Sequence, residues 1–253
     1  MLSDWGLRHD GRKCDEARAL RAELGVCLDA DGSARFAMGQ TECVATVSGP
    51  KEHRRRSEQL HDRATIRAEM MRMPFAGFER REVKSSDWQQ QDMGRTLQET
   101  LESVVCADLF PKALIEVQVR VRQDDGGALA CAINAACLAL VDAGIPMTAL
   151  VCGVTVGTQE NDIVLDINGR ERGQDCATLT VASTCHDNDD PAAHDQHIVR
   201  LVSVRQDGVL DRPQLAPCVR AALDGARQVH MFLRDMCRKH ACQQLASRGV
   251  FDN

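Results

Sequence analysis

Residues 114–146 read LIEVQVRVRQDDGGALACAINAACLALVDAGIP, and this stretch decides the fold. Its first part, Leu114–Val121, alternates strictly between apolar and polar residues, which is typical of a strand with one buried face. Beyond a polar turn, Gly126–Asp142 is rich in alanine and almost wholly apolar. That composition predicts a buried helix, closed by Gly144 and Pro146. The order of strand and then helix is the unit from which the rest of the chain is built.

Toward the N-terminus the pattern predicts further strands and one helix. The turn Asp29-Ala30-Asp31-Gly32-Ser33 lies between Ala19–Leu28 and Ala34–Ala37, which predicts a hairpin. Thr41–Ser48 alternates and predicts a strand that stops at Gly49-Pro50. Two more elements are expected before the central strand: a strand over Thr65–Met73 and a helix over Arg95–Ala107.

Toward the C-terminus the same order of strands and then a helix recurs. Strands are expected over Ala149–Gly157, Asp162–Asp166, Ala177–Ala182 and His197–Val204. Apolar residues at three- and four-residue steps predict a long helix from Gln214 to Ser247. Strands followed by helices, twice over, indicate the α+β class with two related halves. We expect the first half to span residues 1–147, and the second half, with the long C-terminal helix, to span residues 148–253.

The composition is that of a soluble globular protein, since 43% of the 253 residues are hydrophobic and 27% are charged. The longest apolar stretches lie near Ala128–Val141 and Ala149–Val156. Both are shorter than the roughly 18–20 residues that a membrane-spanning helix needs. The polar start, Met1–Asp10, lacks the apolar core of a signal peptide. We therefore expect a soluble intracellular protein with no membrane partner.

The twelve cysteines include no CxxC pair, and several lie inside apolar runs. In an intracellular chain this pattern predicts reduced thiols that are buried as small apolar groups. One cluster, Cys185, His186, His194 and His197, has metal-binding residue types, but its spacing fits no closed zinc pattern. We predict neither a metal site nor any other cofactor.

Charge is distributed unevenly along the chain. The formal net charge is −6, yet residues 51–95 hold eleven Lys or Arg and eight Asp or Glu, a local balance of +3. A basic segment on an acidic body suits a protein that contacts phosphate groups locally while partners cover other faces. The plainer alternative is a solvated charged surface.

Short motifs along the chain resemble, in order, those of the RNase PH family of exosome ring subunits. The motifs, which extend over about residues 1–170, are Leu2-Ser3-Asp4, Gly6-Leu7-Arg8, Asp10-Gly11-Arg12, Ala30-Asp31-Gly32-Ser33-Ala34, Val47-Ser48-Gly49-Pro50, Met73-Pro74-Phe75, Leu109-Phe110-Pro111, Gln123-Asp124-Asp125-Gly126-Gly127 and Leu140-Val141-Asp142-Ala143-Gly144-Ile145-Pro146-Met147. Each motif alone is a modest signal, but their ordered combination is specific.

The resemblance implies a fold, a set of partners and a cellular location. The fold is the RNase PH-like α+β fold, with two related halves of mixed sheets packed with helices. The partners are a second RNase PH-like subunit that pairs with this chain in a six-membered ring, RNA in the central channel, RNA-binding cap proteins and a separate hydrolytic nuclease. The expected location is the nucleus, including the nucleolus, and the cytoplasm.

The resemblance also implies how phosphate would be bound, and two of the required groups are missing. Active members place a Gly-Ser at a helix N-terminus, whose free N–H groups bind anions. Gly126 and Gly127 keep that anion-site remnant, but the serine falls at Gly127 or Ala128. The plainer alternative is that the glycines only permit a tight turn. The family pattern Asp-Arg-Arg/Lys-Ser reads Asp87-Trp88-Gln89-Gln90 here, so Trp88 and Gln89 replace cations that would grip phosphate.

The third group is a pair of acids that the family places after Leu165-Asp166, with about six residues between them. By simple alignment the first acid falls at Arg170 and the second at Cys176. Glu171 or Asp175 could serve if the alignment shifts by one residue. The three substituted elements together predict a site without catalytic residues.

RNA contact needs only positive charge along the backbone path, so it can persist after catalysis is lost. Arg67 corresponds to a channel-lining family arginine, and Arg80 and Arg81 to a second basic position. Arg54–Arg56 form a third basic run with no clear family counterpart. The alternative for all of them is surface solubility. With 3% aromatic residues and no tyrosine, base stacking is not expected to dominate.

We therefore expect a non-catalytic ring subunit that scaffolds 3′→5′ RNA degradation and ribosomal RNA processing and lines the RNA channel. One alternative is an active phosphate-dependent 3′→5′ exoribonuclease. A second is a self-assembling transfer-RNA trimming enzyme of the bacterial type.

Overall fold

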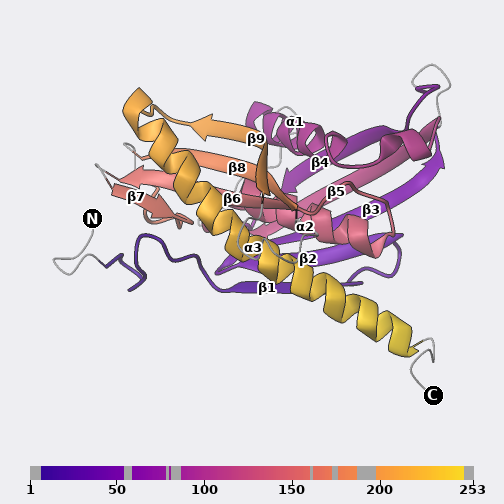
Figure 1. Ribbon diagram of the computed structural model, residues 1–253, viewed down its shortest axis with the longest axis horizontal. Coiled ribbons are helices and arrows are strands. Elements are labelled where there is room, and N and C mark those ends of the chain that lie inside the picture. Colours follow the sequence, from indigo (N-terminus) through magenta and orange to yellow (C-terminus); the bar gives the residue numbers. More distant parts are fainter. Residues whose placement is uncertain are drawn as a thin grey trace.

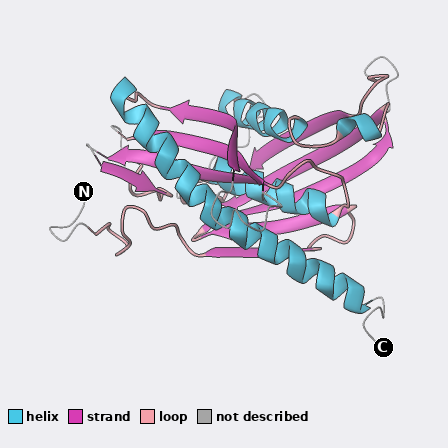
Figure 2. Cartoon of the chain, in the orientation of Figure 1, coloured by secondary structure: helices cyan, strands magenta, loops and turns pink. Residues whose placement is uncertain are grey.

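In the residues that the structure describes, the chain forms two β-sheets and three α-helices (Figures 1 and 2). The computed structural model describes residues 7–53, 59–77, 80, 87–159, 162–172, 176–186 and 198–247. The first sheet has the order β1-β2-β3-β5-β4, with β1 Leu20–Leu24, β2 Gly32–Met38, β3 Thr41–Glu52, β4 Thr65–Arg72 and β5 Ala113–Gln123. It is a mixed sheet, because β4 and β5 are parallel while the other neighbours are antiparallel.

The second sheet belongs to the C-terminal part of the chain. Its order is β7-β6-β8-β9, with β6 Val151–Gln159, β7 Asp162–Leu165, β8 Ala177–His186 and β9 Ile198–Asp207. All its described pairs are antiparallel. The α+β class with two sheets is therefore confirmed, and only the first sheet is mixed.

Helix α2 (Ala128–Asp142) lies between the two sheets and contacts strands of both. Every residue from Leu129 to Leu140 is buried, which explains why its sequence is apolar on all faces. The strands approach it closely. A Cβ added at Gly32 of β2 would overlap backbone atoms of the helix, and one added at Gly153 of β6 would lie 2.9 Å from the Ala130 oxygen.

One buried polar side chain joins this helix to the second sheet. Asn134 is fully buried; its Nδ2 donates to the Gly153 oxygen at 3.0 Å, and its Oδ1 accepts from the Gly153 nitrogen at 2.8 Å. Both polar groups of Asn134 are thus satisfied, as a fully buried amide requires.

The other two helices cover the sheets from outside. Helix α1 (Trp88–Glu102) packs mainly on β4, and the short 3₁₀ helix η2 (Ala107–Leu109) follows it. Helix α3 (Arg212–Ser247) crosses the second sheet and continues past α2 toward β1 (Figure 1). There Phe232 meets Phe36 edge to face, with ring centroids 6.2 Å apart.

The structure corrects two of the expected element boundaries. Strand β3 does not stop at Gly49-Pro50 but continues to Glu52, with a shift in its pairing with β5 between Ser48 and Lys51. Proline has no N–H to donate, and such an irregularity is where a strand tolerates it. Helix α1 begins seven residues before the expected Arg95 and ends at Glu102. Its first two turns contain two large apolar residues, Trp88 and Met93, which are five positions apart, so apolar spacing could not reveal them.

Candidate functional site

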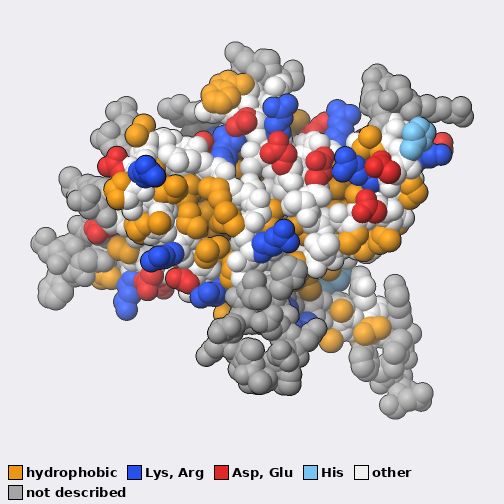
Figure 3. Space-filling model, turned by 45° about the horizontal axis from the view of Figure 1, so that its top comes forward, with side chains coloured by type: hydrophobic (Ala, Val, Ile, Leu, Met, Phe, Trp, Pro, Cys, Tyr) orange, Lys and Arg blue, Asp and Glu red, His pale blue; other side chains and the backbone are white. Residues whose placement is uncertain are grey.

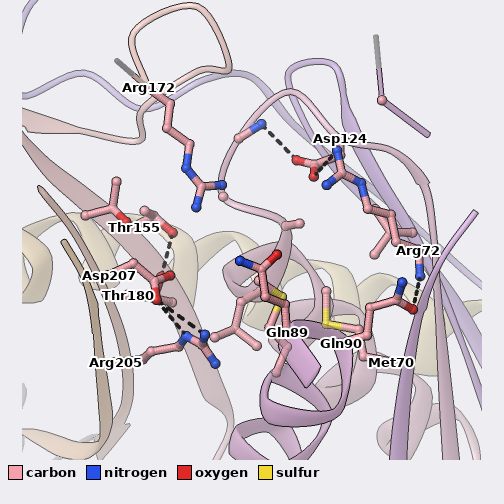
Figure 4. Close-up of a pocket in the computed structure, with 18 of the residues that line it drawn as sticks. Met70, Arg72, Gln89, Gln90, Asp124, Thr155, Arg172, Thr180, Arg205 and Asp207 are labelled. Carbon is pink, nitrogen blue, oxygen red and sulfur yellow. Dashed lines mark hydrogen bonds and ion pairs between the residues drawn. The ribbon is translucent and has the colours of Figure 1, made fainter. Parts of the chain in front are cut away.

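A cavity of about 360 Å³ lies where the two sheets meet the N-terminal ends of α1 and α2 (Figure 4). Its apolar lining comes from Met70, Met73, Pro74, Met93, Val121, Leu129 and Ile167. Its charged and polar lining includes Arg72, Asp87, Gln89, Gln90, Asp124, Asn168, Arg172, Arg205 and Asp207. An apolar cavity with a few convergent polar groups is the usual form of a ligand site.

The N-terminus of α2 forms one wall of the cavity. Gly126 and Gly127 both have positive φ angles, 90° and 69°, and Gly127 caps the helix without a side chain. A Cβ at Gly126 would overlap the Ile167 oxygen, so the turn can pack against the chain after β7 only as glycine. Ala128 begins the helix and brings no hydroxyl to this wall. Hydroxyl groups in the cavity lining come from Thr155, Thr178 and Thr180, and the Thr155 and Thr180 oxygens are 3.3 Å apart.

The N-terminus of α1 forms the opposite wall. Asp87 caps this helix, because its Oδ1 accepts from the Gln89 nitrogen at 3.2 Å and its Oδ2 from Gln90 Nε2 at 3.3 Å. Trp88 is 69% exposed at the rim. Trp88, Gln89 and Gln90 all line the cavity beside Asp87, so this wall has three neutral side chains and one carboxylate.

Three arginines reach the cavity from other elements. Arg72 pairs with Asp124 at 3.0 Å. Arg205 of β9 pairs with Asp92 of α1 at 2.6 Å and with Asp207 at 3.3 Å, which ties α1 to the second sheet. Arg172 extends from the chain after β7 toward the middle of the cavity, opposite Gln89 (Figure 4). Within the described residues Arg172 forms no ion pair, so it is the cavity cation most available to an anion.

A buried charge cluster lies beneath the cavity and holds its floor. Asp166 has a positive φ of 54°, and its carboxylate accepts from the Arg18 nitrogen at 2.9 Å, Nε at 2.8 Å and Nη2 at 2.6 Å. The Arg18 guanidinium also donates to the backbone carbonyl oxygens of Asp125 and Gly126, at 2.9 and 3.0 Å. Arg8 Nη2 donates to the backbone carbonyl oxygen of Asp166 at 2.9 Å, and Arg8 pairs with Glu171. The N-terminal segment thereby fixes both the turn before α2 and the chain after β7.

Glu171 is the acidic member of this cluster whose titration can be tested. Burial raises the pKa of Glu171, but hydrogen bonds from Arg8 and the Asn168 N–H, with the charge of Arg8, outweigh it and lower the pKa below its ordinary 4.5. A carboxyl with a lowered native pKa stabilises the fold above about pH 4.5 and stops doing so as pH falls through the native value.

We expect Glu171→Gln to lower the free energy of unfolding by about 1–2 kcal/mol at pH 7, because the charge-assisted hydrogen bonds to Arg8 are weakened. Urea unfolding at pH 7 and pH 4 checks this, and the difference from the unchanged protein should shrink at pH 4. Glu23→Gln is the control, because its pair with Arg35 is 3.4 Å long and exposed. An equal loss at both pH values would contradict the assignment.

The structure places the predicted catalytic positions in different surroundings. Gly126, Gly127, Ala128, Trp88 and Gln89 all line the cavity. Arg170 and Cys176 are absent from its lining, which instead contains Arg172 and Thr178, a pair with the same six-residue spacing. Asp175 lies outside the described residues, and Glu171 turns to Arg8. That these are former catalytic positions stays a prediction.

Arg67 and Arg80 are the predicted RNA-binding arginines that the structure describes, and neither is in the cavity lining. Arg67, on β4, is 61% exposed and pairs with Glu69 at 3.1 Å. Arg80 is exposed, whereas Arg81 and Arg54–Arg56 lie outside the described residues. Their contact with RNA also stays a prediction.

Residues that sequence reasoning missed include Arg72, Arg172, Thr178 and Arg205. Thr178 and Thr180 alternate along β8 and both face the cavity, so the strand period could have found them. No comparable periodicity surrounds Arg172.

The predicted absence of a metal site is not tested. The described residues contain no group of three or more His, Cys, Asp or Glu side chains placed to hold a metal. In the cluster considered from the sequence, Cys185 is buried in β8, while His194 and His197 lie outside the described residues. Among the described helices, none is long and apolar enough to cross a membrane.

Comparison with known proteins gives matches along nearly the whole chain. Residues 16–146 match the model of domain 1 of the 3′ exoribonuclease family, RNase PH. The mouse protein "Exosome complex component RRP41" is 34% identical over 250 residues, 98% of both chains. The human protein of that name is 34% identical over 241 residues, 95% of this chain and 94% of the human one.

Solved structures agree with the fold. The crystal structure of rice Rrp46 has a TM-score of 0.76 at 27% identity and covers 91% of this chain and 100% of the rice chain. A chain of the Archaeoglobus fulgidus exosome with RNA bound to the active site has a TM-score of 0.72 at 22% identity, covering 88% of this chain and 91% of that one. At that identity the archaeal likeness concerns the fold alone.

Proposed function

The chain belongs to the RNase PH family of 3′ exoribonucleases, and from this premise we propose that it is a ring subunit of an RNA exosome, of the RRP41 type, without catalytic activity of its own. In this role it scaffolds 3′→5′ RNA degradation and ribosomal RNA processing and lines the path of the RNA. The relatives named RRP41, which match along almost their full length, support the subunit type.

The proposed loss of catalysis rests on one observation: each carboxylate in the described lining of the cavity already has a hydrogen-bond or ion-pair partner within the protein. Among its described lining residues the acids are Asp87, Asp124 and Asp207. Asp87 caps α1, Asp124 holds Arg72 and the Gly126 N–H, and Asp207 holds Arg205. Attack by phosphate on RNA needs a positioned phosphate and a proton donor for the leaving oxygen. Ala128, Gln89 and Trp88 offer neither an ionised nor a hydroxyl group for these tasks.

The partners follow from the same proposal. A second RNase PH-like subunit pairs with this chain in a six-membered ring, cap proteins bind RNA at one face, and a separate nuclease supplies hydrolysis. Exposed apolar side chains on β9, Leu201 at 45% and Val204 at 42%, support a protein contact. Figure 3 shows one group of apolar side chains in the left part of this face, with charged side chains of both signs around it and across the right part. Arg67, Arg80 and Arg81 line the RNA channel, and the assembly works in the nucleus, including the nucleolus, and in the cytoplasm.

The purified chain, alone and paired with its ring partner, should release no nucleoside diphosphates from single-stranded RNA when inorganic phosphate is added. Chromatography of the products with and without phosphate measures this, and an active phosphorolytic member of the family serves as the positive control. Release that depends on phosphate would support the alternative, an active phosphorolytic 3′→5′ exoribonuclease, for which Arg172 would be the available phosphate ligand. A homohexamer in light scattering would instead favour the self-assembling transfer-RNA trimming enzyme.

A further inference from the structure

Helix α3 lies on the outside of the molecule and buries only one of its sides (Figure 1). The buried side includes Val229 and Leu233, which are at most 1% exposed. The opposite side, called the outer face below, is formed by residues three, four or seven positions apart. These residues are Arg220, Asp224, Arg227, Met231, Arg234, Arg238 and Leu245. From Arg220 to Arg238 the outer face extends over about 27 Å of helix.

The charge of α3 is opposite in sign to that of the whole chain. Between Arg212 and Ser247 there are six Lys or Arg and two Asp, a local balance of +4, whereas the chain as a whole carries −6. A positive surface on an acidic protein attracts partners of negative charge. The outer face is therefore a candidate contact surface for an acidic partner.

The arginines of the outer face differ in their availability to such a partner. Arg227 pairs with Asp224 at 3.0 Å, and Arg234 is half-buried and already interacts within the protein. Arg220 and Arg238 are exposed, and among the described residues neither has a carboxylate within 4.0 Å. These two guanidinium groups are the ones that remain for carboxylates of a partner.

Apolar side chains lie between and beyond these cations. Met231 is 58% exposed in the middle of the outer face, and Leu245 is 39% exposed near its C-terminal end. A methionine side chain is flexible and polarisable, so it adapts to apolar groups of different shapes. The partner that satisfies the whole face therefore combines negative charge with apolar side chains.

The outer face is separated from the cavity by the second sheet. Cys152 of β6 donates to the Ala226 oxygen of α3 at 3.4 Å, while the next residue, Gly153, contacts α2. Successive residues of a strand point to opposite faces, so α2 and α3 lie on opposite sides of this sheet. The cavity lies at the N-terminus of α2, and a ligand bound there does not contact the outer face of α3.

Two other occupants fit the outer face less well. Single-stranded nucleic acid would find no stacking partner, because Phe232, the one aromatic residue in the sequence of α3, packs against Phe36. A second copy of this chain, joined through the same face by a two-fold axis, would bring the arginines of the two copies together. An acidic protein segment has neither disadvantage.

We propose that the outer face of α3 binds an extended acidic segment of a protein partner, with carboxylates on Arg220 and Arg238 and an apolar side chain on Met231. An extended segment of roughly eight residues spans the 27 Å or so between the two arginines. The proposal goes beyond the proposed function, because it needs neither RNA nor the cavity. It assigns the chain a second contact surface, for protein.

The test measures fluorescence anisotropy of a labelled peptide with the full-length chain over a range of salt concentrations. The probe is a peptide of about twelve residues that repeats Glu-Glu-Leu, long enough to reach both arginines. It should bind, and binding should weaken as salt screens the charges. Arg220→Gln/Arg238→Gln should weaken binding about fivefold and reduce its salt dependence. Met231→Gln should weaken binding about threefold with the salt dependence unchanged, because the lost contact is apolar.

The matched control is Arg63→Gln/Arg120→Gln, which removes the same charge from exposed positions of the first half of the chain. This control should bind the peptide as tightly as the unchanged chain, and circular dichroism should show all variants folded. The same peptide with Gln in place of Glu should bind at least roughly tenfold more weakly, since its carboxylates are gone.

Four outcomes would overturn the proposal. One is the absence of peptide binding at about 50 mM salt, where screening is weak. A second is equal weakening by both double variants, which would mean that only overall charge matters. A third is displacement of the peptide by a single-stranded RNA of equal charge at a lower concentration, which would make the face a nucleic-acid surface. The fourth is loss of peptide binding when the chain is paired with its ring partner, which would show that α3 faces that partner. None of these results bears on phosphorolysis, so the proposed loss of catalysis is judged separately.

Discussion

Replacement of Asp166 with alanine should lower the free energy of unfolding by about 3–5 kcal/mol, because it leaves a buried guanidinium without its partner. The side chains of Asp166 and Arg18 are 1% and 7% exposed and are joined by hydrogen bonds of 2.6 and 2.8 Å. Burial lowers the pKa of Arg18, but Asp166 outweighs burial and the pKa is raised, so the arginine stays charged. Urea unfolding followed by circular dichroism measures the loss.

A double-mutant cycle shows whether the ion pair itself is responsible. Asp166→Asn keeps the shape and tolerates the positive φ angle of this residue, so it isolates the charge. The double variant Arg18→Met/Asp166→Asn should lose less stability than the sum of its two single changes, because no unpaired buried charge remains. Strict additivity of the two losses would show that Arg18 and Asp166 do not act as a pair.

Asn134→Leu should lower the free energy of unfolding by about 2–6 kcal/mol, although leucine has a similar volume. The change leaves both the N–H and the C=O of Gly153 buried without a partner, and each such group costs about 1–3 kcal/mol. The N–H and the C=O of Gly153 cannot reach other partners, because α2 packs against this residue. Chemical denaturation gives the value.

Ile133→Val, one position earlier on the same buried helix, is the control for simple changes of core packing. It should cost only about 0.5–1.5 kcal/mol, since it removes one methyl group and no hydrogen bond. If the two variants lose the same stability, the bonds between Asn134 and Gly153 do not hold the helix against the second sheet.

The sequence predicted the fold well wherever burial gives the apolar residues a recognisable pattern. The alternation in β5 and the apolar composition of α2 are direct consequences of one buried face and of burial on all sides. The start of α1 could not be found this way, because Asp87 begins the helix through a cap while the first turn faces the cavity with Trp88, Gln89 and Gln90. Strand β3 passes Pro50 because its partner strand continues to pair beyond the irregularity.

The candidate site was predicted less completely, for a physical reason. Gly126, Gly127, Trp88 and Gln89 were singled out because they match positions of family motifs, and they line the cavity at the N-termini of α2 and α1. Arg172 and Arg205 come from elements far apart in the sequence, and only the packing of the sheets brings them together. The chain after β7 has no period, so nothing in the sequence shows that Arg172 lies in the cavity lining while Arg170 does not. That Arg170 and Cys176 are former catalytic positions stays a prediction.

The helix between the two sheets has a consequence for how the molecule can be divided. Helix α2 lies within residues 1–147, yet its side chains fill the interior of the part that follows. Cleavage of the chain at the predicted boundary, after residue 147, would separate the C-terminal fragment from α2, the helix against which β6 packs. One side of α2 would then be exposed to water. The two halves therefore share one core and are not separate modules.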